Sequence, residues 1–312
     1  MFQESRALFI YAVSPVHMGA GTAFGLIDNP IQRERHTDYP LLAGSGLKGA
    51  VRHRWWSQLD ETARKDSQSL LNRLFGPESK AADHAGAVSF SDAQLVAFPV
   101  RSLKGAFVYA TSPTALARAQ RALDVAGVAA GWTIPKVDAG HCQIANPDLL
   151  YDDKLALEAF EFSAQCSKEL RIISEWLAEN ALPEGDAHHF FRGKLRDDLV
   201  LLSDEDFGYF ARNATVVEPH VRIDDASGTA ADTGLFYTEN LPPESLMLGL
   251  AMASQERSRN GAGLGAAQVM SKLIEGGDGF DGLDGALVQV GGDATAGRGQ
   301  VVLKALGGKS DG

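Results

Sequence analysis

The feature that most constrains the fold is a glycine-rich segment, GSGLKG at residues 44–49, which interrupts an apolar run and opens a helix. The preceding run Pro40–Ala43 is strand-like, and the apolar residues that follow recur at helical spacing: Leu47, Ala50, Val51, Trp55 and Leu59. The pattern therefore predicts a loop that leads into a helix N-terminus, with Ser45 as the capping residue.

This helix N-terminus has the properties of a phosphate site. Free backbone N–H groups and the positive end of the helix dipole attract anions. Lys48 and Arg52 lie four residues apart on the helix face opposite the apolar stripe, and Trp56 extends that face by a further turn. We expect Ser45, Lys48 and Arg52 to contact phosphate groups. The alternative is a glycine turn before an ordinary amphipathic helix with solvated charges.

A nucleotide-binding enzyme is a competing interpretation of the same segment. Gly44, Gly46 and Gly49 match the G-x-G-x-x-G spacing, but Asp60 and Glu61 close this first helix instead of ending a following strand. A phosphate loop of the Walker type needs Ser or Thr after its lysine, and Gly49 follows Lys48. Both matches are weak.

A second glycine-bearing loop lies upstream. His17–Gly21 follows a first strand predicted at residues 8–13 and leads to Asp28, which precedes Asn29-Pro30. A carboxylate in that position is commonly a turn former, because Asp hydrogen-bonds its own backbone. Near the C-terminus, GGDATAGRGQ at residues 291–300 places Arg298 among glycines, where backbone and guanidinium can both reach a phosphate. A plain glycine hairpin is the alternative there.

Four motifs taken together resemble one family. They are H-x-G-x-G from His17, G-x-x-D-x-P-I-x-R from Gly25, P-x-x-x-G-S-G-L-K-G-A-x-R from Pro40, and the glycine loop at 291–299. This combination resembles the RAMP superfamily of CRISPR proteins and, within it, the backbone subunits of the type III-B effector, the Cmr complex. The resemblance covers roughly residues 5–306.

The mixture of strands and helices without strict βαβ alternation predicts an α+β fold. The resemblance implies a single RAMP domain over 1–312 with a ferredoxin-like, RRM-related core. It also implies a helical insertion at about 60–200 and a β-hairpin thumb at about 215–240 that lies across a guide–target duplex. Residues 307–312 are expected to be a flexible tail. Locally, we predict that helix continues over 59–76 and that 183–189, with its His188-His189 pair, is a surface loop.

The resemblance implies a function: a subunit that binds guide CRISPR RNA along its backbone, polymerises on it with further copies of itself and other Cmr subunits, and cleaves complementary target RNA in antiviral defence. Asp28 is implied as the catalytic carboxylate and metal ligand, with His17 and Glu239 as helpers in proton transfer. The implied guide contacts are Gly19, Gly21, Ser45, Lys48, Arg52, Gly292 and Arg298.

The chemistry has two forms: metal-dependent hydrolysis, with Mg²⁺ as the expected cofactor, or attack by the RNA's own 2′-hydroxyl. One carboxylate is a poor metal cage, so substrate phosphate must complete any Mg²⁺ site. Two other functions stay open. In the first, the chain is a non-catalytic type III backbone subunit, as in III-A complexes, and Asp28 is only a turn former. In the second, it is a RAMP endoribonuclease that processes precursor CRISPR RNA.

The net charge of −11 argues against a nucleic-acid partner if taken alone. Its distribution is uneven, however: residues 29–56 hold five Lys or Arg against two acids, whereas 151–206 hold fourteen acids against six basic residues. An RNA groove on one face and an acidic opposite face fit that asymmetry. The two cysteines, Cys142 and Cys166, lie far apart, and no segment has the length of a membrane span, so we expect a cytoplasmic protein without membrane contact.

Overall fold

The computed structural model describes residues 2–21, 25–66, 69–77, 84–258 and 263–307. Most of the tail expected at 307–312 therefore lies outside the described residues, which end at Gly307. The helices are α1 (Gly44–Gln58), α2 (Glu61–Lys65), α3 (Leu70–Phe75), α4 (Pro113–Val125), α5 (Lys168–Asn180), α6 (Asp186–Asp197), α7 (Asp204–Asn213) and α8 (Ala266–Ile274).

The centre of the molecule is a ferredoxin-like βαββαβ unit. Its strands are β1 (Glu4–Ala12), β3 (Val88–Phe90) with β4 (Ala93–Arg101), β12 (Leu246–Ala253) and β16 (Gln300–Leu306). They lie in the order β16-β1-β12-β4, each antiparallel to its neighbour, with β3 also on β12. Helix α1 connects the first two strands and α8 the last two. The predicted α+β fold with a ferredoxin-like core is confirmed.

Further strands widen this unit into a 12-stranded sheet within the described ranges. They are β2 (Leu41–Leu42), β5 (Phe107–Thr111), β6 (His141–Ile144), β7 (Lys154–Leu157), β8 (Phe160–Cys166), β9 (Leu199–Leu202) and β15 (Leu287–Gln289). The β5–β9 and β6–β8 pairs are parallel. Our division into one domain with an insertion at about 60–200 stays a prediction; by strand pairing, the connection from β4 to β12 spans 102–245.

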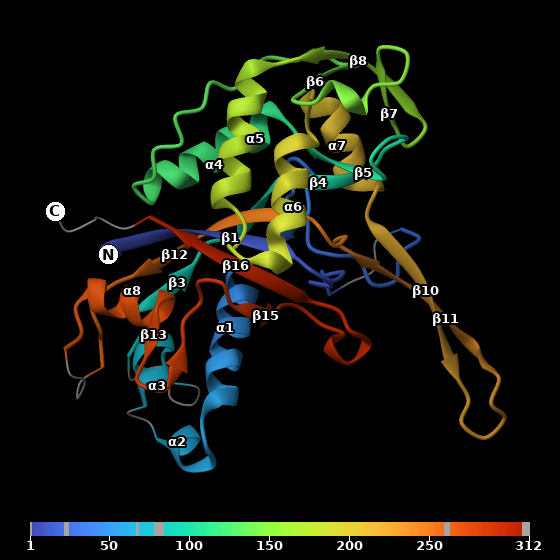
Figure 1. The fold of residues 1–312 in the computed structure, drawn as a ribbon. Coiled ribbons are helices and arrows are strands. Elements are labelled where there is room, and N and C mark those ends of the chain that lie inside the picture. The colour runs from blue at the N-terminus through green and yellow to red at the C-terminus, as the bar shows by residue number, and fades with distance from the viewer. Residues whose placement is uncertain (1, 22–24, 67–68, 78–83, 259–262, 308–312) are drawn as a thin grey trace.

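Helices cover both faces of the sheet (Figure 1), and β1 shows why. Its even-numbered residues Leu8, Ile10 and Ala12 belong to a core shared with α1, α3 and α8, whereas Ala7, Phe9 and Tyr11 belong to a core shared with α4, α5 and α6. Successive side chains of a strand point to opposite faces, so an uninterrupted apolar strand serves both cores.

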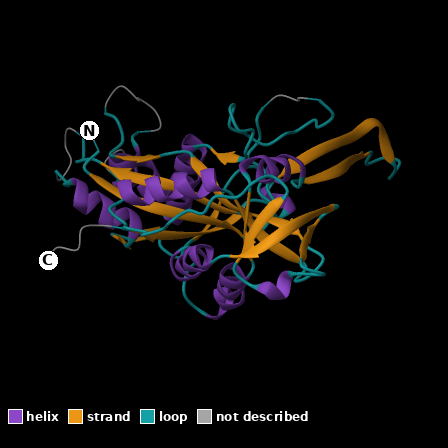
Figure 2. Cartoon of the chain, turned by 90° about the horizontal axis from the view of Figure 1, so that it is seen from above, coloured by secondary structure: helices purple, strands orange, loops and turns teal. Residues whose placement is uncertain are grey.

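A long hairpin projects from this body (Figures 1 and 2). It consists of β10 (Val216–Ile223) and β11 (Ala230–Asn240), which pair antiparallel with Val217 opposite Glu239. Apolar side chains on it are exposed, among them Val221, Leu235 and Phe236. A second, smaller antiparallel pair is formed by β13 (Gly276–Gly277) and β14 (Phe280–Asp281).

Two local predictions are wrong. The continuous helix over 59–76 is instead α2 and α3, because Asp60 and Ser69 each cap a new helix start, by accepting the backbone N–H of Ala63 and Asn72. Residues 186–189 are not loop but the first turn of α6, which follows Gly185 at φ 116°. Only Leu195 of α6 is fully buried, but Ala187, Phe191 and Leu195 recur at helical spacing and Phe191 packs against the same core. The sequence therefore contained a helical pattern that the loop prediction overlooked.

Among the described helices, none combines the length and apolar character that crossing a membrane requires.

Candidate nucleic-acid interface

The base of the hairpin contacts the loop that contains His17 and the segment that contains Asp28. Strand β11 pairs with β10 along one edge, and its other edge carries backbone hydrogen bonds to both loops. Asn29 N donates to the Tyr237 carbonyl at 3.0 Å, and Glu239 N donates to the Asn29 carbonyl at 2.9 Å. Further along, Val16 and Leu241 exchange two backbone bonds of 2.9 Å. The loops are thereby fixed against one strand.

Asp28 lies at this edge with its side chain exposed. Its Oδ2 accepts the backbone N–H of Tyr237 at 2.7 Å, which fixes the direction of the carboxylate. Oδ1 has no hydrogen-bond partner among the described residues. The carboxylate is thus oriented by the hairpin and still open to a ligand, and it contributes nothing to the apolar core.

His17 lies at the same edge, half-buried, where its Nδ1 bonds the Glu239 carbonyl at 2.7 Å. A carbonyl oxygen only accepts, so Nδ1 carries the proton and the neutral ring presents Nε2 as an acceptor. A Cβ on Gly19 would lie 3.0 Å from that Nε2, so glycine keeps space beside it. Because Asp28 bonds Tyr237 and His17 bonds Glu239, their anchor points are about 7 Å apart along the strand.

Glu239 itself is 2% exposed. Its Oε1 accepts hydrogen bonds from Arg33 and from Thr215 at 2.8 Å, and its Oε2 accepts the backbone N–H of Ile31 at 3.1 Å. Arg33 also donates to backbone carbonyls at the end of α7, 3.1 Å to that of Ala211. Glu239 therefore ties the Asp28 loop to the hairpin and to α7, and both of its oxygens are engaged. This geometry favours a positioning role over the expected help in proton transfer.

The predicted cap of α1 is wrong. The helix begins at Gly44, its N-cap is Ala43 without a side-chain bond, and Ser45 lies exposed inside the first turn. Gly44 is required there because a Cβ would lie 2.2 Å from the carbonyl oxygen of Phe90. The Gly44 N–H donates to Asp92 Oδ1 at 2.8 Å. An acidic side chain from the connection between β3 and β4 thus satisfies one of the N–H groups expected to receive phosphate.

Lys48 and Arg52 have no acidic partner among the described residues. Lys48 is half-buried, and this burial, together with the neighbouring Arg52 charge, lowers the pKa of the Lys48 ammonium. Arg52 donates to Asn72 Oδ1 at 3.2 Å, a neutral acceptor. In the part of the chain that the structure describes, no carboxylate forms an ion pair with either residue.

The C-terminal glycine loop packs against His17. Gly292 N donates to the His17 carbonyl at 2.8 Å, and a Cβ on Gly291 would lie 2.2 Å from that oxygen. Arg298 is half-buried and forms an ion pair with Glu218 of β10, so its guanidinium is neutralised inside the chain. The predicted residues His17, Gly19, Asp28, Glu239, Gly292 and Arg298 therefore meet around the hairpin base.

Comparison with known proteins decides the family. The sequence model of the RAMP superfamily matches residues 9–302. The chain belongs to the RAMP superfamily. It is 33% identical over 299 residues to the CRISPR system Cmr endoribonuclease Cmr4 of Pyrococcus furiosus, an alignment that covers 95% of this chain and 94% of that protein.

Solved structures agree with this assignment. This RAMP chain matches the crystal structure of oligomeric Cmr4 from Pyrococcus furiosus with a TM-score of 0.71 at 26% identity, over 98% of this chain and 100% of that one. It also matches a chain in the cryo-EM structure of the type III-B Cmr-beta complex bound to cognate target RNA, with a TM-score of 0.71 at 19% identity, over 97% and 98% of the two chains. At that identity the second match shows the shared fold alone.

Several residues of the RAMP chain's candidate site escaped the sequence analysis. Asp92, Glu218 and Tyr237 hold site residues through contacts between segments far apart in the chain, which no local pattern reveals. Arg33 ends the quoted motif G-x-x-D-x-P-I-x-R, so a signal was present. Lys48, Arg52 and Ser45 lie on α1, which contacts the His17 loop through Met18: the Ala43 N–H approaches Met18 Sδ at 3.1 Å.

The donor set does not form a metal cage by itself. Among the described residues, no three His, Cys, Asp or Glu side chains are grouped so as to hold a metal ion. Asp28 offers one carboxylate, one oxygen of which already accepts the Tyr237 N–H. A resident Mg²⁺ takes octahedral oxygen coordination, which this residue cannot provide alone. Any cation at Asp28 therefore needs further oxygen ligands from water or from a bound molecule.

Proposed function

We propose that this chain is the repeating backbone subunit of a type III-B CRISPR effector complex, and that it binds guide RNA and cleaves the paired target RNA in antiviral defence. The observation that carries the proposal is the similarity, over 95% of the chain, to a relative whose name describes a Cmr endoribonuclease. The oligomeric state and the target RNA named for the matched structures support copies of itself, RNA and other Cmr subunits as partners in a cytoplasmic complex.

In this proposal the protein holds RNA by its backbone and leaves sequence to base pairing. Lys48 and Arg52, which have no acidic partner among the described residues, present positive charge on α1 near its N-terminus, where Asp92 already accepts the Gly44 N–H. Gly19 and Gly292 keep side chains away from the His17 ring, because a Cβ would lie 3.0 Å from it at Gly19 and 3.7 Å at Gly292. Gly21 is exposed, and a Cβ there would meet nothing within 4 Å. Arg298 joins the phosphate contacts when it exchanges Glu218 for a phosphate.

The proposed chemistry is attack of an RNA 2′-oxygen on the adjacent phosphorus. The P–O5′ bond breaks, the 2′-proton passes to a base, and a proton goes to the leaving 5′-oxygen, giving a 2′,3′-cyclic phosphate and a 5′-hydroxyl. Asp28 is the residue that orients or deprotonates the 2′-hydroxyl, and His17 Nε2 is the second candidate base. Dependence on Mg²⁺, with RNA phosphates as its main ligands, is a separate proposal tested by chelation.

Reconstitution tests the function. The purified chain is mixed with a guide RNA, then with complementary and non-complementary target RNA, and products are resolved on a sequencing gel. We expect cleavage of the complementary strand alone, at regular intervals. Assembly on the guide without any cut would support the non-catalytic backbone subunit. Cutting within the guide's own precursor, and not in the target, would support the processing endoribonuclease.

The RNA contacts are tested with Lys48→Ala and Arg52→Ala. Each should weaken binding of every RNA sequence alike and lower the slope of log affinity against log salt by about 0.7, because each removes one phosphate contact to a single strand. Arg101→Ala is the control, since that side chain is 76% exposed on β4, away from α1. Loss confined to certain RNA sequences, or no loss, would contradict the assignment.

A further inference from the structure

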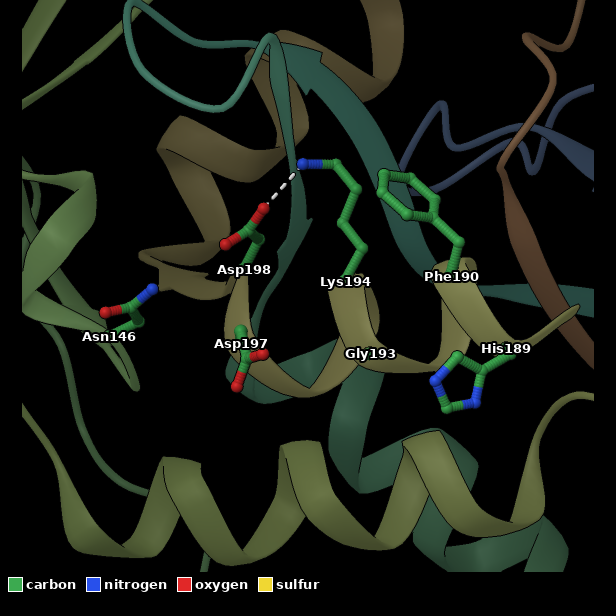
Figure 3. Close-up of a pocket in the computed structure, with 7 residues that line it drawn as sticks. All are labelled: Asn146, His189, Phe190, Gly193, Lys194, Asp197 and Asp198. Carbon is green, nitrogen blue, oxygen red and sulfur yellow. Dashed lines mark hydrogen bonds and ion pairs between the residues drawn. The ribbon is translucent and has the colours of Figure 1, made fainter.

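Two surface hollows of similar size differ in whether their charged side chains have partners of opposite charge. The hollow beside α6, of about 420 Å³, is lined by Asn146, His189, Phe190, Gly193, Lys194, Asp197 and Asp198 (Figure 3). Its charged side chains form ion pairs within the chain: Lys194 pairs with Asp198 at 2.5 Å, and Asp197 pairs with Arg196 at 2.8 Å. Such a neutralised surface offers nothing for an ionic ligand.

The hollow beside α1 is different. It measures about 370 Å³ and is lined by Gly49, Arg52, His53 and Trp56. Arg52 lacks a carboxylate partner among the described residues, and Lys48, half-buried one turn before it on the same helix face, lacks one as well. In a chain with a net charge of −11, two neighbouring cations without acidic partners mark a place for an external anion.

The far end of this hollow is an aromatic stack. The rings of His53 and Trp56 lie nearly parallel, at 18° with centroids 5.6 Å apart. The guanidinium of Arg64 lies 3.9 Å from the centroid of the Trp56 ring, and Arg64 Nε donates to the Trp56 carbonyl at 3.2 Å. His53 is exposed, so this end of the stack is accessible to solvent. Planar groups of this kind receive nucleobases without sequence preference.

Gly49 is a second observation that favours a ligand bound against α1. It lies inside α1, exposed, and a Cβ there would meet nothing within 4 Å. Glycine inside a helix costs about 1 kcal/mol relative to alanine, and no packing in the chain requires it here. A bare backbone between Lys48 and Arg52 suits the close approach of a sugar–phosphate chain.

We propose that His53, Trp56 and Arg64 form a nucleotide subsite for single-stranded RNA, in which a base stacks on the His53–Trp56 rings and its phosphate contacts Arg52 and Arg64. The subsite continues the path of Lys48 and Arg52 by one helical turn to Trp56, and it rests on the proposed function as an RNA-binding subunit. The recognised class is RNA that has an unpaired base at this position, irrespective of which base it is.

The test separates base stacking from phosphate binding. The full-length chain is titrated with a fluorescein-labelled 12-nucleotide oligoadenylate and with an oligomer of equal length that lacks bases. Trp56→Ala should weaken the first by roughly ten-fold, the usual scale of one stacked base, and leave the second unchanged. Trp56→Phe should retain most of the affinity. Phe190→Ala is the matched control, because this aromatic is 69% exposed on α6.

Each other outcome has a definite meaning. Wild-type chain that binds RNA, with Trp56→Ala unchanged for both oligomers, removes the subsite and leaves the proposed function standing. If the wild-type chain binds neither oligomer, both the subsite and the proposed RNA-binding function are contradicted. An equal loss for both oligomers shows that Trp56 acts only on phosphate contacts or on the helix. A loss of self-association without RNA, with RNA affinity unchanged, assigns the face to a neighbouring copy. If Trp56→Ala does not fold, the exposed His53→Ala takes its place and should show the same selective loss.

Discussion

At the scale of residues, Glu239 can be tested for a structural role against a catalytic one. Its carboxylate is buried and joins Arg33, Thr215 and the Ile31 backbone. Glu239→Ala leaves the Arg33 guanidinium without its acid, and breaking a buried pair in this way costs about 3 kcal/mol. We expect that loss in urea unfolding. The control Glu161→Ala removes an ion pair whose acid is 65% exposed, which should cost less than about 1 kcal/mol. Full stability with abolished RNA cleavage would instead make Glu239 a catalytic group.

Glu244 supplies a pH-dependent prediction. Burial raises the pKa of this carboxyl from 4.5 to about 7, next to the hydroxyl of Tyr11, which also bonds that of Tyr109 at 2.8 Å. Between these two values the folded chain binds more protons than the unfolded chain, so Glu244 lowers stability as pH rises from 4.5 to 7.

Glu244→Gln removes that dependence. Compared with wild type, the variant should be more stable by on the order of 1 kcal/mol at pH 8, a value reduced for partial solvent exposure, and equally stable at pH 4. Thermal unfolding at the two pH values measures the difference. A variant less stable than wild type at pH 8 would contradict the effect of burial.

The site could be predicted from sequence only where a motif is local. His17, Asp28 and the α1 cations stand in short runs that predict loops and a helix start, and the structure places them in those elements. Ser is a strong capping residue, which favours Ser45 as the cap, but the N-cap is Ala43, two residues earlier, where Gly44 lies close to the Phe90 carbonyl. Glu218 pairs with Arg298 across 80 residues, and no local pattern contains such a contact.

At the scale of elements, α1 combines a glycine that packing requires with one that packing does not. A Cβ on Gly44 would overlap the Phe90 carbonyl, whereas a Cβ on Gly49 would meet open space. Gly49→Ala should therefore stabilise the chain by about 1 kcal/mol, and Gly44→Ala should destabilise it severely. Differential scanning calorimetry of both variants tests this. A destabilised Gly49→Ala would show that packing within the chain needs this glycine.

Element prediction succeeded for α1, where Leu47, Val51 and Trp55 recur at helical spacing and are all buried. It failed for α2, α3 and α6. The first two are separated by a new cap. Helix α6 has Phe191 and Leu195 four residues apart on the face that packs inward, but its N-cap is Gly185 without a side-chain hydrogen bond, so the local signal for a helix start is missing.

At the scale of the whole molecule, the ferredoxin-like arrangement explains why distant motifs meet. Strands β1 and β16 are neighbours although they lie at opposite ends of the chain, so the loop after β1 and the glycine loop before β16 share one end of the sheet. The hairpin base returns to the same place through β12, which pairs with β1. Composition and local patterns predict the fold class, but only this strand order brings His17, Asp28 and Gly292 together.

Asp28→Asn tests the central claim most directly. Asn keeps an oxygen for the Tyr237 N–H and loses the charge, so folding and loop position should persist. Guide and target binding are measured beside target cleavage, with Mg²⁺ and with chelator, and Asp225→Asn on the exposed hairpin tip serves as the control. The account predicts unchanged binding and cleavage reduced by about a hundred-fold or more. Undiminished cleavage, or cleavage lost only together with binding, would contradict it and leave His17 as the next candidate.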